Sequence, residues 1–251
     1  MALGGGSAWA IAHIGVIKIF EENGIKIHSI SGTSAGSIVA SLYAFGISVE
    51  KMQEIALNLH LSDIFKWKVS RMGLSSTQKI KHLIKKYIGN AKVEEALIPL
   101  YIPATDIVNL KPTLMQNVSV AEAVAASCAI PGMFTPVTIN NQMFVDGSLF
   151  ADVPCKILKL KKLGLVVGVE LTDMNILTKK PENVFEVITK SLQGLINETR
   201  KERLKYADVI ISPNIRSVGR FEFEKAHLLL EIGQNAAKKH INYIKRRLGI
   251  R

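Results

Sequence analysis

The 251-residue sequence contains only two cysteines, Cys128 and Cys155, with no Cys-x-x-Cys pair and no Cys/His cluster. This scarcity argues against a disulfide framework and a structural zinc site, so we expect no metal. The longest apolar runs, such as Leu163–Val169, contain glycine and fall far short of the roughly 20 residues that a membrane span needs. The start, Met1–Ala10, has no charged and apolar regions typical of a secretory signal, and we expect a cytoplasmic protein.

Acidic residues are also few: 21 Asp and Glu stand against 32 Lys and Arg, which leaves a formal net charge of +11 at pH 7. Such an excess fits an anionic partner, but it also fits solvated helix faces that carry surplus lysines. We favour the second interpretation, because the excess gathers in the helical stretches Lys79–Lys86, Lys156–Lys162 and Lys238–Arg251. No nucleic-acid-binding signature is present and the lysines are not interleaved with aromatic residues, so we expect no nucleic acid as a partner.

The chain has no linker rich in Pro, Gly or Ser and no internal repeat, so we expect a single domain over residues 1–251. Apolar runs predict strands, and amphipathic patterns between them predict helices. The predicted strands are Ile25–Ser31, Pro99–Ala104, Gln142–Val145, Leu163–Leu171 and Asp208–Ser212. The predicted helices are Ile11–Asn23, Ser34–Phe45, Thr77–Ile88, Val118–Ser127, Asn183–Lys205 and Phe223–Leu248. This alternation indicates an α/β fold with a central, mainly parallel sheet covered on both faces.

The segment Gly32-Thr33-Ser34-Ala35-Gly36 matches the pattern G-x-S-x-G and lies between a predicted strand and a predicted helix. In this context a serine sits on a sharp turn, with its hydroxyl at a helix N-terminus where N–H groups stabilise an oxyanion. The flanking glycines let neighbouring segments approach without a Cβ clash. Ser34 is our candidate nucleophile, and a plain tight turn is the alternative.

An α/β-hydrolase does not fit, because several strands precede the nucleophile in that fold and an Asp and a His follow it. The late histidines, His227 and His240, lie in a helical pattern without turn residues. The glycine-rich start Gly4-Gly5-Gly6-Ser7 exposes backbone N–H groups that suit an oxyanion or a phosphate. It does not match G-x-G-x-x-G in either register, and we expect no dinucleotide cofactor.

Two carboxylates are candidates for the general base. Asp146 follows a predicted strand in Phe144-Val145-Asp146-Gly147-Ser148, where a side chain can face the crevice at the carboxyl ends of the strands. Asp106, in Ala104-Thr105-Asp106, is the competing group. The local sequence does not separate the two, and an ordinary Asp-Gly turn is the alternative for Asp146.

Together these segments resemble the patatin-like phospholipase family, particularly its compact bacterial members. Four blocks carry the resemblance, in order and at compatible spacing over nearly the whole chain. They are Leu3–Ala8 running into Ala12–Val16, the Gly32–Gly36 turn, Ala126-Ser127 through Ile130-Pro131 to Phe134–Pro136, and Val145–Ser148 followed by Val153-Pro154.

The resemblance implies a three-layer patatin-like sandwich and a serine lipid acyl hydrolase that releases fatty acid from (phospho)lipid esters through an acyl-enzyme. Ser34 would be the nucleophile and Asp146 its base, with Asp106 structural, the histidines non-catalytic and no cofactor. The implied oxyanion-hole residues are Gly4, Gly5, Gly6, Ser7 and Ala35, and the motif-supporting glycines are Gly32, Gly36 and Gly147.

Several positions depart from the family pattern. Trp9 stands where the family usually has Arg or Lys, Ala10 where it has Gly, and Ser148 where Gly or Ala is more common. The first strand, which starts at Met1, is shorter than usual. The departures at Trp9 and Ala10 motivate the alternative function, a patatin-fold regulator or scaffold with little turnover.

The segment Leu61–Leu74 mixes aromatic and aliphatic residues, including Phe65 and Trp67, with Lys66, Lys68 and Arg71. Aromatic residues beside cations suit a peripheral contact with anionic lipid, and we expect the segment to form part of a lid over an acyl pocket. The alternative is a connecting segment whose apolar side chains belong to the core.

Overall fold

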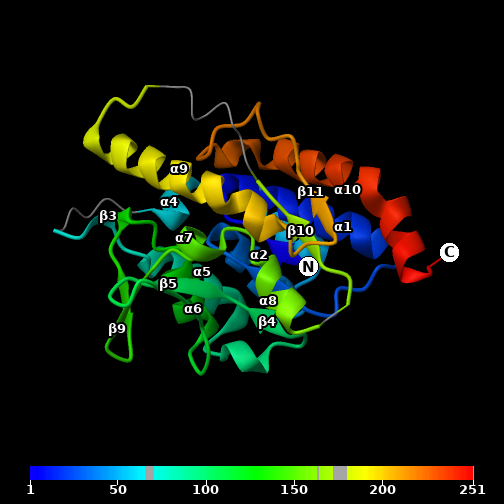
Figure 1. Ribbon diagram of the computed structural model, residues 1–251, viewed down its shortest axis with the longest axis horizontal. Coiled ribbons are helices and arrows are strands. Elements are labelled where there is room, and N and C mark those ends of the chain that lie inside the picture. The colour runs from blue at the N-terminus through cyan, green and yellow to red at the C-terminus, as the bar shows by residue number, and fades with distance from the viewer. Residues whose placement is uncertain (66–70, 163, 172–179, 251) are drawn as a thin grey trace.

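The computed structural model describes residues 1–65, 71–162, 164–171 and 180–250. Its centre is a five-stranded sheet of order β11-β10-β1-β2-β4, in which every neighbouring pair is parallel. The strands are Ala2–Leu3 (β1), Ile30–Gly32 (β2), Leu100–Tyr101 (β4), Val167–Val169 (β10) and Val209–Ile211 (β11). Helices flank this sheet (Figure 1), which confirms the predicted α/β class.

The helices agree closely with the sequence patterns. The six predicted helices are α1 (Ile11–Glu22), α2 (Ala35–Ala44), α5 (Gln78–Ile88), α6 (Val120–Ser127), α9 (Val184–Leu204) and α10 (Ala226–Leu248). Shorter ones are α3 (Val49–Leu57), α4 (Leu61–Ile64), α7 (Ser148–Ala151) and α8 (Cys155–Leu160). Among the described residues, none of these helices has the length and apolar character needed to cross a membrane.

A second, antiparallel sheet accompanies the central one, and the sequence patterns did not separate the two. Its order is β6-β5-β9-β8, with β5 (Pro103–Asp106), β6 (Lys111–Leu114), β8 (Val137–Ile139) and β9 (Gln142–Val145). The predicted strand Pro99–Ala104 is divided, so that β4 joins the central sheet and β5 the second one. Pro103 has no N–H to continue a parallel ladder, which suits a change of sheet at this point. A parallel pair, β3 (Gly73–Ser75) and β7 (Gly132–Phe134), completes the strands.

The short strand β1 occupies the middle of the central sheet. Leu3 lies opposite Val169 of β10 on one side and Gly32 of β2 on the other, and it is fully buried. The carboxyl ends of β1 and β2 therefore lie side by side. Because the glycine-rich loop follows β1 and the Ser34 turn follows β2, both segments meet at the edge where α/β proteins bind ligands.

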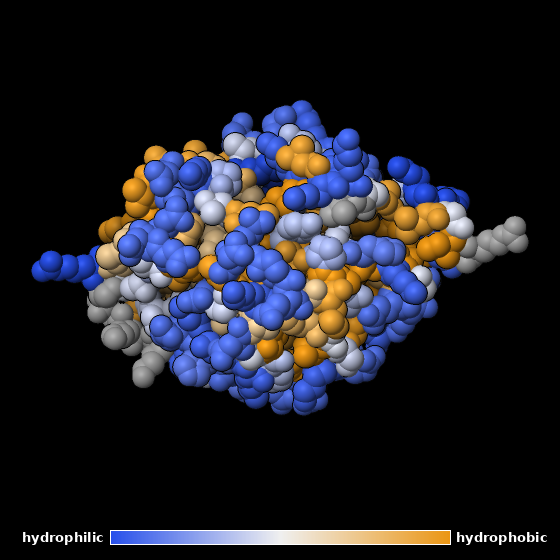
Figure 2. Space-filling view, turned by 90° about the horizontal axis from the view of Figure 1, so that it is seen from below, coloured by the Kyte–Doolittle hydropathy of each residue, from blue (hydrophilic) through white to orange (hydrophobic). Residues whose placement is uncertain are grey.

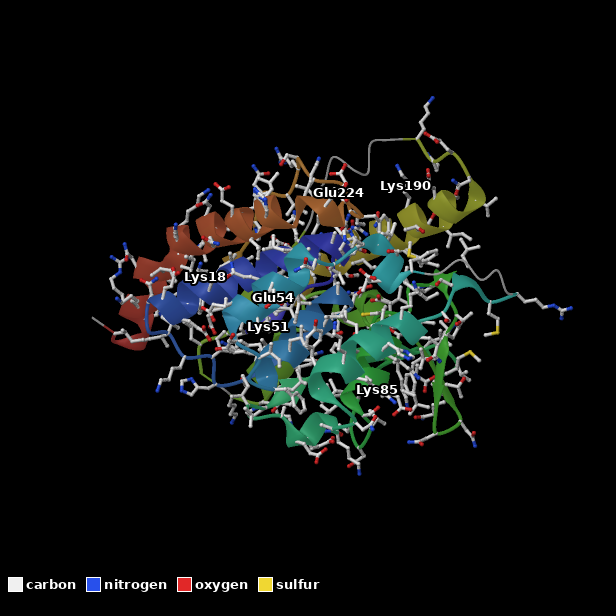
Figure 3. The ribbon with its side chains drawn as sticks, turned by 180° about the vertical axis from the view of Figure 1, so that it is seen from behind. Lys18, Lys51, Glu54, Lys85, Lys190 and Glu224 are labelled. Atoms are coloured by element: carbon white, nitrogen blue, oxygen red, sulfur yellow. The ribbon has the colours of Figure 1, made fainter. Side chains whose placement is uncertain are left out.

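The surplus lysines lie on separate helices. Lys18 on α1, Lys51 on α3 and Lys85 on α5 are labelled in Figure 3. Lys51 pairs with Glu54 on its own helix at 2.7 Å, and Lys18 with Glu22 at 3.8 Å. This distribution agrees with the interpretation of solvated helix faces.

Helices α1 and α10 lie side by side (Figure 1), and their backbones approach each other closely at two glycines. A Cβ atom at Gly233 of α10 would overlap the carbonyl oxygen of Ala12, and one at Gly15 of α1 would overlap the carbonyl oxygen of Leu230. Both glycines are therefore required by the close approach of the two helices, of which α1 follows the glycine-rich loop in the chain.

We predict that Gly233→Ala destabilises the protein by about 1–3 kcal/mol, because the added methyl group forces the two helices apart. The matched control is Gly194→Ala in α9, where an added Cβ meets no described atom within 4 Å. That substitution should stabilise by about 0.5–1 kcal/mol through helix propensity. Urea unfolding of both variants measures the difference, and equal effects would contradict the packing argument.

Candidate active site

Ser34 lies on the turn between β2 and α2, at the carboxyl end of a central strand. Its φ is 52° and its ψ is −132°, a backbone conformation that residues other than glycine rarely adopt. The two flanking glycines are needed here: a Cβ at Gly32 would overlap the carbonyl of Gly36, and one at Gly36 would overlap the carbonyls of Leu3 and Gly4. The turn has the strained strand-to-helix geometry expected of a nucleophile.

Ser127, the last residue of α6, fastens this turn to the second sheet. Its hydroxyl accepts a hydrogen bond from the Ser34 N–H at 3.0 Å and donates to the carbonyl of Pro103 at 2.7 Å. Its own carbonyl accepts from the Gly147 N–H at 3.3 Å. One fully buried residue thus connects the Ser34 turn with the residue that follows Asp146.

Asp146 follows β9 and is almost fully buried, with 2% of its surface exposed. Its backbone is held on both sides, by the carbonyl of Ala129 at 2.9 Å and the hydroxyl of Thr105 at 2.9 Å. The carboxylate Oδ1 accepts from the Ser148 N–H at 2.9 Å, whereas Oδ2 has no hydrogen-bond partner in the described part of the chain.

Burial raises the pKa of Asp146 from 3.8 to about 6. The N–H of Ser148 and the side chain of Ser34 oppose this rise, which means that the Ser34 hydroxyl lies within interaction range of the carboxylate. A carboxylate with this pKa is ionised at neutral pH and basic enough to accept a proton from an alcohol in a transition state.

Asp106, the competing carboxylate, has a different environment. Its Oδ1 accepts from the N–H groups of Val108 and Asn109 at 3.0 Å each, and its Oδ2 accepts from the Asn109 side chain at 2.8 Å. These hydrogen bonds, that of the Asn109 side chain first, lower the pKa of Asp106. Both of its oxygens hold the turn after β5, while Asp146 shares a pocket with Ser34.

The glycine-rich loop runs from β1 into a 3-10 turn at Ser7–Ala10. The Gly4 N–H donates to Val169 at 2.9 Å and the Gly5 N–H to Asp152 at 3.3 Å, so these two groups hold the loop in place. In the described part of the chain, no hydrogen bond occupies the N–H groups of Gly6 and Ser7. Of the five implied oxyanion-hole residues, only Gly6, Ser7 and Ala35, the first residue of α2, retain N–H groups for a ligand.

His13 of α1 makes a hydrogen bond to this loop. It is fully buried, and burial lowers the pKa of its ring to about 4, so the ring is neutral. Its Nε2 lies 2.8 Å from the carbonyl oxygen of Gly4 and must therefore carry the hydrogen that it donates. His13 is thus a packed residue of α1 that also holds the glycine-rich loop by a hydrogen bond.

Two pockets meet at Ser34. One, of about 840 Å³, is lined almost entirely by apolar side chains, among them Ile14, Ile38 and Leu42. The other, of about 810 Å³, is lined by polar and apolar groups together. The polar groups include Gly5, Gly6, Asp146, Ser148, Asp152, Gln193, Asn197, Arg200 and Arg220. Such an arrangement can hold an apolar chain on one side of the serine and a polar group on the other.

Comparisons with known proteins show the family to which this chain belongs. A family model described as patatin-like phospholipase matches residues 1–159, and the chain belongs to that family. An uncharacterized NTE family protein of Mycobacterium tuberculosis is 29% identical over 174 residues, which cover 68% of this chain and 48% of that protein. Lysophospholipase NTE1 of Yarrowia lipolytica is 27% identical over 183 residues, covering 68% of this chain and 12% of that protein.

The chain spans about half the length of the mycobacterial relative, and less of the yeast one. The crystal structure of VipD from Legionella pneumophila matches with a TM-score of 0.62 and 14% identity, covering 96% of this chain and 66% of that one. At this identity the likeness concerns the fold.

Four residues at this site were not predicted from the sequence: Ser127, Asp152, Arg200 and Arg220. Ser127 lies in a block that carries the family resemblance, but no local signal indicated that it holds the nucleophile turn. Arg200 and Asp152, which pair at 2.6 Å, come from distant segments. Arg220 places its guanidinium 4.8 Å from the ring centre of Trp9, the position where the family usually has a cation. No pattern in the sequence predicts this contact between Arg220 and Trp9.

We predict that Ser127→Ala destabilises the protein by about 1–3 kcal/mol, because the Ser34 N–H would remain buried without an acceptor. Ser41→Ala is the matched control: Ser41 is a buried serine of α2 whose hydroxyl has no partner among the described residues, so its loss should be neutral or stabilising. Denaturant unfolding measures both. If both variants lost a similar amount of unfolding free energy, the predicted stabilisation by the Ser127 hydrogen bond would be contradicted.

We predict a pH-dependent stabilisation by Asp146→Asn. Since the folded pKa of Asp146 lies above its value in the unfolded chain, ionisation destabilises the fold as pH rises from about 4 to about 6. The variant should gain up to about 3 kcal/mol at pH 7 and progressively less towards pH 4. Asp106→Asn is the control of opposite sign, since a lowered pKa stabilises the fold above pH 4. Unfolding curves across this range measure both, and a gain for both variants would contradict the assignment.

Proposed function

We propose that the protein is a serine lipid acyl hydrolase in which Ser34 and Asp146 act as a catalytic dyad. The observation that carries this proposal is the position of Ser34, on a strained turn beside a buried carboxylate and at the junction of an apolar and a polar pocket. Family membership supports lipid ester hydrolysis in general, and the dyad is the more specific step.

In the acylation step, the Asp146 carboxylate accepts the hydroxyl proton of Ser34 while Oγ attacks the carbonyl carbon of the ester. The C–O bond to the alcohol then breaks, and the alcohol takes the proton from Asp146 as it leaves. In deacylation, Asp146 accepts a proton from water, the hydroxide attacks the acyl-enzyme, and the proton returns to Ser34. Fatty acid is the product, and no cofactor takes part.

The negative charge that develops on the carbonyl oxygen needs donors already in position. The N–H groups of Gly6, Ser7 and Ala35 supply them, the last at the positive end of the α2 dipole. Gly4 and Gly5 act indirectly, because their N–H groups tie the loop to Val169 and Asp152. Loss of one donor typically lowers turnover by about 10²–10³.

The apolar pocket takes the acyl chain, and its mouth suits a lipid surface. Leu61 and Phe221 line this pocket and yet are 43% and 41% exposed, so they form part of its rim. Figure 2 shows hydrophobic patches among hydrophilic side chains on one face of the molecule. Phe65 packs against Phe134 with ring centres 5.6 Å apart, as a lid segment or a core segment would. Trp67, the residue on which the expected lipid contact depends most, lies outside the described residues.

Labelling with a fluorophosphonate probe, followed by intact-mass measurement, tests the dyad. Wild type should take one adduct and Ser34→Ala none. Asp146→Asn should react about 10²-fold more slowly or worse, because the serine has lost its base. The wild-type rate should rise with pH through about 6 as Asp146 ionises. Ser41→Ala, which changes a buried serine within α2, should label like wild type.

Two outcomes would contradict the proposal. An adduct that persists in Ser34→Ala would place the reactive group elsewhere. No adduct on folded wild type would favour the patatin-fold regulator with little turnover.

A further inference from the structure

The apolar pocket runs along one face of α2, away from Ser34. Its α2 residues are Ala35, Ile38, Val39 and Leu42, whose spacing of three and four residues places them on one side of the helix. From Ala35 to Leu42 the helix axis advances by about 10 Å, at a rise of about 1.5 Å per residue. This face of α2 is therefore a wall along which an acyl chain can extend from the serine towards the carboxyl end of the helix.

Leu42 and Met52 lie at the end of this pocket that is remote from Ser34. Helix α2 ends at Ala44 and α3 begins at Val49, so only residues 45–48 connect the two helices. Leu42 is the last residue of α2 that lines the pocket, and Met52 is the first of α3. Both are therefore close in the chain to the connection between the two helices.

Burial distinguishes this end of the pocket from its exposed rim. Leu42 is 3% exposed and Met52 is fully buried. Beyond them, Ala44 and Val49 are also buried, and neither lines the pocket. An acyl chain that extends from Ser34 along α2 therefore meets packed side chains after about 10 Å.

Helix α3 presents Met52 and Ala56, one turn apart, to the pocket, and both are buried. Lys51 and Glu54, labelled in Figure 3, are exposed and pair with each other at 2.7 Å. The two positions in the pocket can therefore be changed without altering this charged surface. At position 56 the native side chain is small, so a larger one would take up space in the pocket.

We propose that Leu42 and Met52 are specificity-determining residues that limit the acyl chain to about 8–10 carbons, so that the site selects medium-chain esters. This inference rests on the proposed function, in which the apolar pocket takes the acyl chain. An extended hydrocarbon advances about 1.25 Å per carbon, because C–C bonds of about 1.5 Å meet at about 111°. The length of about 10 Å from Ala35 to Leu42 therefore holds about eight carbons beyond the ester carbonyl.

The hydrophobic effect makes this limit measurable. Each methylene group that leaves water for the pocket strengthens binding about fourfold. Carbons beyond the end of the pocket gain no such burial unless they displace Leu42 or Met52, and displacement of packed side chains is unfavourable. The value of kcat/KM should therefore rise steeply with chain length until the pocket is full, and no further.

Four p-nitrophenyl esters in the same neutral detergent micelles test the proposal: butyrate, octanoate, laurate and palmitate. Wild type should prefer octanoate over butyrate about 10²-fold and gain nothing further with laurate or palmitate. Leu42→Ala and Met52→Ala lengthen the pocket, and each should raise the laurate-to-octanoate ratio of kcat/KM about 10-fold. The matched controls are Leu158→Ala and Met115→Ala, which truncate equally buried residues outside the pockets at Ser34 and should leave the ratio unchanged.

Ala56→Leu provides a variant of opposite sign, which leaves no cavity and so tests the proposal even if a truncated variant fails to fold. Its larger side chain takes up part of the pocket and should lower the octanoate-to-butyrate ratio about 10-fold.

The proposal is overturned if wild-type kcat/KM keeps rising from octanoate to palmitate, or if Leu42→Ala and Met52→Ala change the ratio no more than their controls do. Hydrolysis that does not depend on chain length would reject this inference alone. Hydrolysis of none of the esters, with no phosphonate adduct on Ser34, would reject the proposed function and this inference with it.

Discussion

The hydrogen bond from the Ser34 N–H to the Ser127 hydroxyl is the interaction on which the site geometry depends. It joins the turn after the central strand β2 to the end of α6. The carbonyl of Ser127 also accepts from the Gly147 N–H, and that of Ala129, two residues further on, accepts from the Asp146 N–H. Ser34 follows a strand of one sheet and Asp146 a strand of the other, and neither sheet alone sets the distance between them. A buried serine that accepts one hydrogen bond and donates another fixes that distance, because both partners lack access to water.

Burial of Asp146 lowers the stability of the fold and, at the same time, makes its carboxylate a stronger base. The low-polarity surroundings raise its pKa to about 6, and its Oδ2 has no hydrogen-bond partner among the described residues. A fully satisfied carboxylate such as Asp106 has the opposite shift and would be a weaker base. The role proposed for Asp146 as a base depends on this oxygen without a partner among the described residues, and the surrounding backbone hydrogen bonds hold the residue in place.

The pockets on either side of Ser34 differ because different elements build them. Helices α1, α2, α3 and α5 contribute apolar side chains to one, while the glycine-rich loop, α9 and the loop before α10 contribute polar groups to the other. The polar wall includes two arginines: Arg200, which pairs with Asp152, and Arg220, whose guanidinium lies over the Trp9 ring. Substrate orientation at a single serine can follow from this difference in polarity.

The sequence by itself determined the fold class, the boundaries of the six longer helices to within about three residues, and the turn that carries Ser34, whereas the short helices α3, α4, α7 and α8 were not predicted. These features depend on local patterns: apolar periodicity, capping glycines and the G-x-S-x-G spacing. The strand Ile25–Ser31 was predicted too long, since buried Ile25 and Ile27 alternate like strand residues but β2 begins only at Ile30.

Only the tertiary structure decided which N–H groups of the glycine-rich loop are occupied, which carboxylate shares a pocket with Ser34, and which residues join the site from afar. Sequence separations of 93 residues between Ser34 and Ser127, and of more than 200 between Trp9 and Arg220, explain this. Contacts over such distances arise from the packing of whole elements, and no local pattern of residues encodes them.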